Sequence, residues 1–325
     1  MMPNRPAPGY RTDLVPVRGG ELTVGIWGDD DAPTVIAVHG ITATHRAWAL
    51  LGETARDLRI VAPDLRGRGR SNTLPGPWGM ATHADDLAAV VGHFGLVGNG
   101  LAGHDDAGPL VVVGHSMGAF AAVALAARHP LLVDALVLVD GGLPIPPPPG
   151  VAPADIPEAM IGAAARRLGM TFATSDEYRA FWREHPAFAD WTPVIEQYVD
   201  YDLDGLAPRL TPSGDARAVA QDAQELSGEF GYLGDLAAVD CPIDFIRAPR
   251  DLSNELPGLY PPSAVADWQK RMPRLRVHEA AGVNHYTIVM GGRGLEQVLP
   301  VIRAALLPAQ PDPPAPQDAL SRENR

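Results

Sequence analysis

Short runs of apolar residues recur along the chain and alternate with stretches whose apolar positions have helical spacing. A run that stays apolar at consecutive positions is typical of a strand that is buried on both faces. Such runs, several of them rich in valine, predict strands at residues 22–27, 34–38, 58–62, 110–113, 135–139, 243–248 and 275–279.

The segments between these strands have the spacing of helices. Residues 82–94 place apolar side chains in the i, i+3, i+4, i+7 pattern, at Leu87, Val90, Val91 and Phe94. Residues 117–127 are rich in alanine and apolar on nearly every side, as expected of a helix that packs on a sheet. Further helices are predicted near residues 263–271 and 295–306. The alternation predicts an α/β fold, with a mostly parallel sheet and helices on both faces.

Proline clusters and a change of pattern divide the chain. Prolines concentrate between residues 144 and 157, directly after a predicted strand, and residues 152–236 contain helical and aromatic positions but no comparable strand. We therefore expect a mostly helical cap over residues 142–236, inserted between core segments 1–141 and 237–307. Residues 1–12 are proline-rich and expected to be loose, and residues 308–325 are expected to form a disordered tail.

Composition excludes several classes of partner. The chain has 26 basic and 39 acidic residues, a net charge of −13, which argues against nucleic acid or an anionic membrane as the main partner. Cys241 is the only cysteine, so neither an internal disulfide nor a thiolate metal cluster can form. The longest apolar run, residues 119–127, is far shorter than the ~20 residues of a membrane span. The amino terminus lacks the apolar segment of a signal peptide, so we expect a cytoplasmic protein. The oligomeric state is not predicted.

The motif G-x-S-x-G is the strongest chemical signal. It occurs as Gly114-His115-Ser116-Met117-Gly118, between a predicted strand and a predicted helix. A sharp turn there holds the serine in a strained conformation, and glycines avoid clashes where the backbone passes closely. We expect Ser116 to be a nucleophile at the amino end of the helix, where the dipole favours negative charge.

A nucleophilic serine needs two backbone N–H groups to bind the oxyanion. The residue after the nucleophile, Met117, would supply one. The turn His39-Gly40-Ile41 follows the strand at residues 34–38, so Ile41 would supply the other.

The general base is expected to lie far along the chain. His285 follows the strand at residues 275–279, which places it at the carboxyl edge of the sheet, where catalytic groups gather in α/β folds. His39 and His115 adjoin the motifs and are interpreted as structural.

Two aspartates compete for the role of the acid that orients the base. Asp251 follows the strand at residues 243–248 and is preferred, because in the order serine, acid, histidine the acid is expected after the penultimate strand. Asp140 ends the strand at residues 135–139 and is the alternative.

Together these segments resemble the α/β-hydrolase superfamily, in its branch of capped carboxylesterases and C–C hydrolases. The resemblance rests on His39-Gly40, the segment Asp64–Ser71 with the pattern D-x-R-G-x-G-x-S, the motif around Ser116, Asp251 and His285. It covers about residues 20–140 and 238–307. It implies a serine hydrolase without metal or cofactor.

We therefore expect hydrolysis of a carboxylic ester or lactone through an acyl-enzyme. The alternatives are hydrolysis of a C–C bond in a vinylogous diketone and a non-catalytic binding protein. The aromatic residues of the cap suggest a fairly bulky apolar substrate, with Trp182 and Tyr198 as candidate contacts. The motif G-x-G-x-x-G at residues 98–103 follows a helix and precedes a strand, the reverse of a dinucleotide site.

Overall fold

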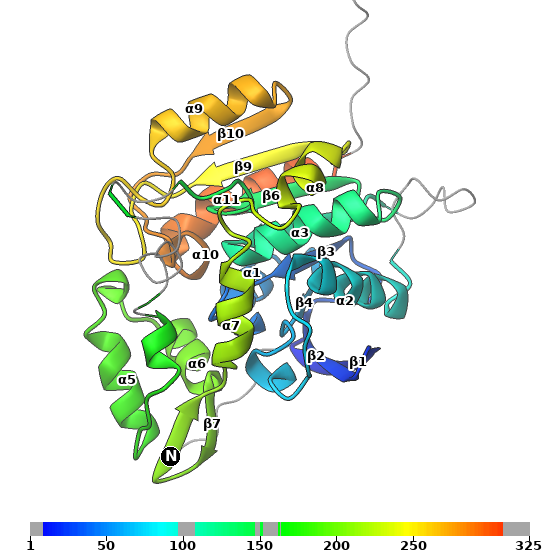
Figure 1. The fold of residues 1–325 in the computed structure, drawn as a ribbon. Coiled ribbons are helices and arrows are strands. Elements are labelled where there is room, and N and C mark those ends of the chain that lie inside the picture. The colour runs from blue at the N-terminus through cyan, green and yellow to red at the C-terminus, as the bar shows by residue number, and fades with distance from the viewer. Residues whose placement is uncertain (1–8, 97–107, 147–149, 152–161, 163, 308–325) are drawn as a thin grey trace, which may run out of the picture.

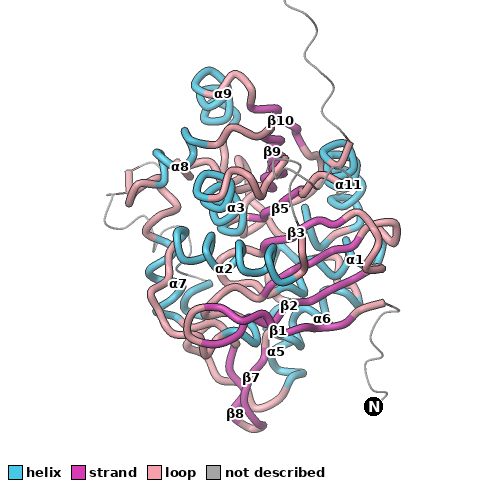
Figure 2. Tube along the Cα trace, turned by 90° about the vertical axis from the view of Figure 1, so that its right-hand side faces the viewer, coloured by secondary structure: helices cyan, strands magenta, loops and turns pink. Residues whose placement is uncertain are grey.

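The computed structural model describes residues 9–96, 108–146, 150–151, 162 and 164–307. A single large sheet lies at its centre (Figure 1). Its eight strands are β1 (Arg11–Val17), β2 (Gly20–Trp27), β3 (Thr34–Val38), β4 (Arg59–Pro63), β5 (Val111–His115), β6 (Ala135–Val139), β9 (Ile243–Arg247) and β10 (Leu275–Glu279). Their spatial order is β1-β2-β4-β3-β5-β6-β9-β10, which Figure 2 shows from β10 at the top to β1 below. β1, β2 and β4 pair antiparallel, whereas all neighbours from β4 to β10 pair parallel. The mostly parallel sheet predicted from the sequence is confirmed.

The strand predicted at each apolar run is present, with ends that agree within two residues. β1 was not predicted, and the expectation that residues 1–12 are loose is wrong for Arg11 and Thr12, which begin this strand. β1 has one fully buried side chain, Val15, and contains Pro16. An edge strand of this kind has too weak an apolar pattern to be found from sequence.

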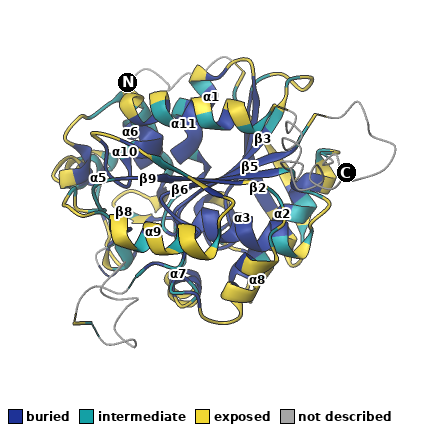
Figure 3. Cartoon of the chain, turned by 90° about the horizontal axis from the view of Figure 1, so that it is seen from above, coloured by how far each residue is buried: buried dark blue, intermediate teal, exposed yellow. Residues whose placement is uncertain are grey.

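Helices cover both faces of the sheet, as Figure 3 shows. One face carries α1 (Ala49–Thr54), α10 (Thr287–Met290) and α11 (Gly292–Ala305), and the other carries α2 (Met80–His93), α3 (Met117–Arg128), α8 (Tyr232–Ala238) and α9 (Pro262–Arg271). Two hydrophobic clusters separate accordingly, because side chains alternate between faces along each strand. Val111 and Val113 of β5 join one cluster, and Val112 joins the other.

Residues 164–223, between β6 and β9, lie at the carboxyl edge of the sheet, to which the arrowhead of β9 points in Figure 1. They contain α5 (Ser175–Arg183), α6 (Pro193–Tyr201), the hairpin of β7 (Leu203–Leu206) and β8 (Arg209–Pro212), and α7 (Ala216–Ala223). We refer to residues 164–223 as the cap segment. The sequence did not predict the hairpin, because its side chains are mostly exposed and no apolar run marks it.

The expected cap boundary at residue 236 falls inside α8. This helix packs on α3, where the rings of Phe120 and Tyr232 lie 4.7 Å apart between centroids. Three further expectations concern residues outside the described parts of the chain: the loose residues 1–8, the motif at residues 98–103 and the tail at residues 308–325. Among the described helices, none combines the length and apolar character needed to span a bilayer.

Candidate active site

The turn from β5 into α3 holds Ser116 in a conformation that side chains rarely adopt, with φ at +55°. The backbone is packed so closely here that the neighbouring glycines have no room for a Cβ atom. A Cβ on Gly114 would lie 2.4 Å from Ala119 Cα, one on Gly118 would lie 2.2 Å from Val38 O, and one on Gly141 would lie 2.1 Å from Ser116 O. These close contacts explain why the motif has glycine at positions 114 and 118, as the sequence predicts for a sharp turn.

Ser116 opens onto a small cavity beneath the cap segment. The cavity has a volume of about 40 Å³. It is lined mainly by apolar groups, namely Gly40, Ile41, Thr42, Ala43, Ala47, His115, Ser116, Ile145, Ala164, Tyr198, Leu226, Leu252, Leu259, His285, Tyr286 and Met290. Ser116 and His285 therefore line the same cavity, although they lie far apart in the sequence. No hydrogen bond joins their side chains in the described structure, which is common before a substrate is bound.

The imidazole of His285 is held by Asp140 at the end of β6. Its Nδ1–H donates to Oδ2 of Asp140 over 2.7 Å, and the other carboxylate oxygen accepts from the N–H of Ala248 at 3.0 Å. A carboxylate can only accept at neutral pH, so Nδ1 of His285 carries the hydrogen and Nε2 is left as the basic nitrogen. This is the tautomer that a general base requires.

The preference for Asp251 over Asp140 is wrong as a matter of geometry. Asp251 lies four residues beyond the end of β9, where its carboxylate accepts from the N–H groups of Ser253 and Glu255 and closes a turn. Asp140 follows β6 directly, and β6 pairs with β5, the strand that carries Ser116. The carboxylate that contacts His285 therefore stands one strand nearer to Ser116 than the preferred Asp251.

His115 supports the other side of His285. Its Nε2–H donates to the carbonyl of His285 at 2.7 Å, and the two rings lie 4.6 Å apart between centroids. Burial is the main reason that the pKa of His115 lies well below its ordinary value, and repulsion from His285 when that ring is protonated adds to it, so the ring of His115 is neutral. The structural role predicted for this histidine agrees with these contacts.

The loop after β3 passes beside the nucleophile, where a Cβ on Gly40 would lie 3.1 Å from Ser116 Cβ. The carbonyl of Gly40 accepts from His39 Nδ1–H at 2.8 Å and from the N–H of Ala43 at 3.1 Å. Because C=O and N–H point in opposite directions across a planar peptide, these bonds also orient the N–H of Ile41. The N–H of Met117 lies in the first turn of α3, where amides lack partners within the helix.

His39 is neutral at physiological pH. Its Nε2 accepts from the N–H of Leu65 at 2.9 Å, which leaves the hydrogen on Nδ1. Complete burial is the main reason that its pKa falls from 6.5 to about 4.

The two aromatic residues proposed from the sequence have different places. Tyr198 lines the cavity. Trp182 does not: it is buried in an aromatic cluster of the cap segment, with ring contacts to Tyr178, Phe188 and Tyr198. Sequence reasoning missed Tyr286 and Met290, which line the cavity through the short segment that follows His285.

The arrangement brings Ser116, the imidazole of His285 and the loop that carries Ile41 to one mainly apolar cavity, whereas Met117 is not among its described lining residues. Metal-ligand clusters of three or more histidine, cysteine or acidic side chains are absent from the described residues.

Comparisons with known proteins agree with this arrangement. A model described as "Alpha/beta hydrolase family" matches residues 35–299. "Lipase LipV" of Mycobacterium tuberculosis is 32% identical over 186 residues, which are 57% of this chain and 61% of that protein. A "2-(acetamidomethylene)succinate hydrolase" of Mesorhizobium japonicum is 26% identical over 268 residues, 82% of this chain and 86% of that protein. The matches to the lipase and to four further relatives, among them a "Bifunctional esterase/perhydrolase DCH" of Acinetobacter calcoaceticus, span less than two thirds of the length of those proteins.

Solved structures share the fold. The crystal structure of E-2-(acetamidomethylene)succinate hydrolase matches with a TM-score of 0.70 and 21% identity, covering 91% of this chain and 97% of that one. A thioesterase domain from the curacin biosynthetic pathway matches with a TM-score of 0.67 and 20% identity, covering 92% and 99%.

Proposed function

Because the chain belongs to the alpha/beta hydrolase family, we propose that it is a serine hydrolase that cleaves a carboxylic ester or lactone through an acyl-enzyme. The observation that carries this proposal is the hydrogen bond from His285 Nδ1 to Asp140, together with the position of Ser116 on the same cavity. A serine beside a base that a buried carboxylate orients is the arrangement used for acyl transfer.

Each step of the reaction assigns a task to a residue. Nε2 of His285 removes the proton of Ser116 Oγ as that oxygen attacks the carbonyl carbon. The N–H groups of Ile41 and Met117 bind the oxyanion of the tetrahedral intermediate, while Asp140 stabilises the imidazolium. The imidazolium then donates its proton to the leaving alcohol. Water, deprotonated by His285, attacks the acyl-enzyme, and the acid and free Ser116 are released.

The cavity supports a short, apolar acyl group. A volume of about 40 Å³ would hold about three water molecules, at roughly 12 Å³ for each. An acetyl or butyryl group suits this space better than the fairly bulky substrate suggested by the aromatic residues of the cap. Its described lining contains no arginine or lysine, so nothing there would pair with a substrate of the two-carboxylate kind that the Mesorhizobium relative is named for.

The test is covalent labelling of the intact protein with a fluorophosphonate, followed by mass-spectrometric mapping of the modified residue. We expect rapid labelling of Ser116 and turnover of p-nitrophenyl acetate, and neither in Ser116→Ala. Labelling at another residue, or no labelling and no turnover by the wild-type protein, would overturn the proposal and favour a binding protein. Labelling of Ser116 with cleavage of a diketone but not of any ester would favour the C–C hydrolase.

A further inference from the structure

Two buried arginines hold successive carbonyl groups of the loop that carries Ile41. Arg68 Nε donates to the carbonyl of Ile41 at 2.9 Å, and Arg167 Nη2 donates to the carbonyl of Thr42 at 3.2 Å. With His39 on the carbonyl of Gly40, three consecutive peptide groups of the loop are fixed by side chains.

Arg68 also reaches the second proposed oxyanion donor. Its Nη2 lies 3.7 Å from the sulfur of Met117, and its Nη1 donates to the carbonyl of Arg66 at 2.9 Å. A single guanidinium group therefore contacts both residues whose N–H groups would bind the oxyanion. Its planar, forked set of donors fixes these contacts in one geometry.

Each arginine is paired with an aspartate of the cap segment. Nη1 of Arg68 lies 2.5 Å from Oδ2 of Asp222 on α7, and Arg167 pairs with Asp202 at the end of α6. All four side chains are at most 3% exposed. A buried guanidinium group requires a counter-charge, because an unpaired charge away from water is strongly unfavourable.

The position of each aspartate is itself fixed by neighbours. Asp222 accepts from the N–H of Gly79 at 2.6 Å and from His83 Nε2 at 2.9 Å. Asp202 accepts from the hydroxyls of Tyr178 and Ser213. Burial raises the pKa of Asp222, but the charges of Arg68 and His83 outweigh this effect and lower the pKa to about 2. Asp222 is therefore a fixed negative charge.

We propose that Asp222 and Asp202 are positioning residues for the oxyanion hole. They hold Arg68 and Arg167 against consecutive carbonyls of the 40–43 loop, so the hole is complete only while the cap segment is docked. The inference rests on the proposed function, because it concerns the same catalytic loop. It assigns to the cap segment a part in the chemistry besides its part in forming the cavity wall.

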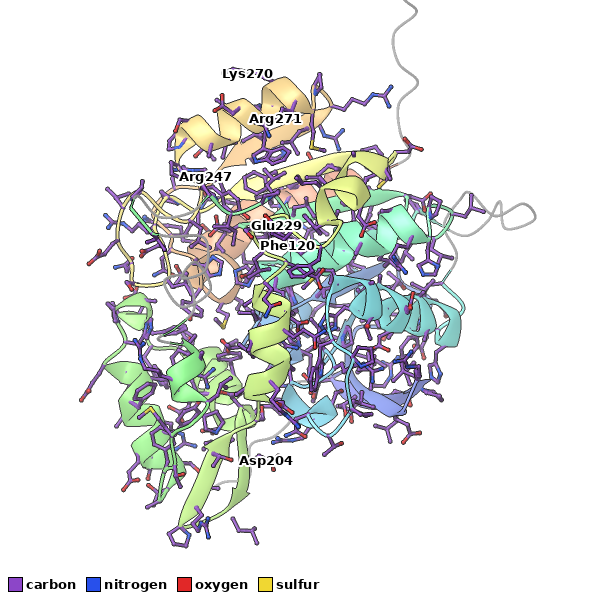
Figure 4. The ribbon with its side chains drawn as sticks, in the orientation of Figure 1. Phe120, Asp204, Glu229, Arg247, Lys270 and Arg271 are labelled. Atoms are coloured by element: carbon purple, nitrogen blue, oxygen red, sulfur yellow. The ribbon has the colours of Figure 1, made fainter. Side chains whose placement is uncertain are left out.

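A contact of the cap segment with the core at another place provides the matched control. Asp204 lies on the exposed hairpin, where its Oδ2 accepts from Asn72 Nδ2 at 2.9 Å. Figure 4 shows Asp204 at the outer end of the cap segment, far from Phe120 on α3. Asp204→Asn weakens a contact of the cap with the core without touching the 40–43 loop.

The experiment compares Asp222→Asn, Asp202→Asn and Asp204→Asn by steady-state hydrolysis of p-nitrophenyl acetate and by inhibition with butylboronic acid, which forms a tetrahedral anion on the serine. Loss of one oxyanion donor lowers kcat by about 10²- to 10³-fold. A donor that is displaced but still present is therefore expected to lower kcat by about 10- to 100-fold. We expect that loss in Asp222→Asn and Asp202→Asn, with KM within twofold and boronate affinity reduced in proportion. Asp204→Asn should match the wild type. A wild-type kcat in Asp222→Asn, or an equal loss in Asp204→Asn, would overturn the inference.

The double variant Arg68→Met/Asp222→Asn separates positioning from folding. It removes both charges, so its resistance to urea should recover relative to Asp222→Asn. Because the donor to the carbonyl of Ile41 is also gone, kcat should remain low. Recovery of kcat together with stability would show a merely structural role and refute the inference. Failure of the wild type to hydrolyse the ester or label at Ser116 would instead refute the proposed function.

Discussion

His285 Nδ1 lies 2.7 Å from Oδ2 of Asp140, a carboxylate with no exposed surface. The strand that ends at Asp140 also supports the nucleophile, because the N–H of Ser116 donates to the carbonyl of Val139 at 3.0 Å. One strand end therefore positions both the acid and the backbone of the serine.

Replacement of this acid should nearly abolish activity. Asp140→Asn would place an amide against Nδ1 and favour the wrong tautomer of His285, a change that lowers kcat by about 10⁴-fold in an established triad. Steady-state hydrolysis of p-nitrophenyl acetate measures the effect. Asp251→Asn is the matched control and should retain kcat within twofold, since Asp251 only closes a turn. A large loss in Asp251→Asn with an active Asp140→Asn would reverse the assignment.

Gly40→Ala should impair catalysis more than stability. The added Cβ atom would lie 3.1 Å from Ser116 Cβ and 3.5 Å from Ser116 Oγ, which forces a small shift of the serine or the loop. A displacement below 1 Å at reacting groups costs about tenfold or more in kcat. Gly92→Ala is the control, because its Cβ would meet nothing within 4 Å. The kcat and the urea unfolding midpoint are measured for both variants. An equal kcat in Gly40→Ala and Gly92→Ala would contradict the prediction.

The buried His39 should make the fold less stable as the pH falls. Its pKa is about 4 in the folded protein and 6.5 when free, so between these values the unfolded chain binds a proton that the folded chain does not. Stability from this group is present above pH 6.5 and is lost as the pH falls toward 4, by about 3 kcal/mol. His39→Gln retains an acceptor for Leu65 and should lose this part of the pH dependence. Urea unfolding of the wild type and of His39→Gln at pH 7 and pH 4.5 tests the prediction. An equal loss of unfolding free energy in both proteins would contradict it.

The length of the acyl chain should be limited by Leu252. Hydrolysis should be fastest with acetate or butyrate p-nitrophenyl esters, and Leu252→Ala should move the optimum toward longer chains, because Leu252 lines the cavity. Removing its side chain beyond Cβ deletes about three methylene equivalents, enough for about two more acyl carbons. Leu256→Ala is the control within the same loop, since Leu256 is 67% exposed and does not line the cavity. An unchanged chain-length profile in Leu252→Ala would show that the acyl group lies elsewhere.

The parts of the fold that follow from local pattern were predictable from sequence. Buried parallel strands such as β5 and β6 are continuous apolar runs, and the motif around Ser116 requires its sharp turn. The edge strand β1 and the hairpin β7–β8 expose most of their side chains, so their apolar pattern is too weak to detect.

The site depends on contacts that no local pattern encodes. Asp140 and Asp251 both follow strands that end at the same edge of the sheet, and only the packing of the loop around His285 decides which carboxylate meets the imidazole. The pair of Arg68 and Asp222 joins segments far apart in the sequence, and each residue alone resembles an ordinary surface charge. Trp182 was misplaced for a similar reason, because aromatic residues of a lid can pack on each other as readily as on a ligand.

In the proposed mechanism the acid is Asp140, directly after β6, so the loop of residues 250–259 supplies no reacting group, although Leu252 and Leu259 border the cavity. This loop can thus shape part of the cavity without carrying a proposed catalytic side chain. Saturation libraries restricted to Leu252 and Leu259 should alter substrate scope, whereas Arg250 and Asn254 should be kept because they contact Asn284, the residue before His285.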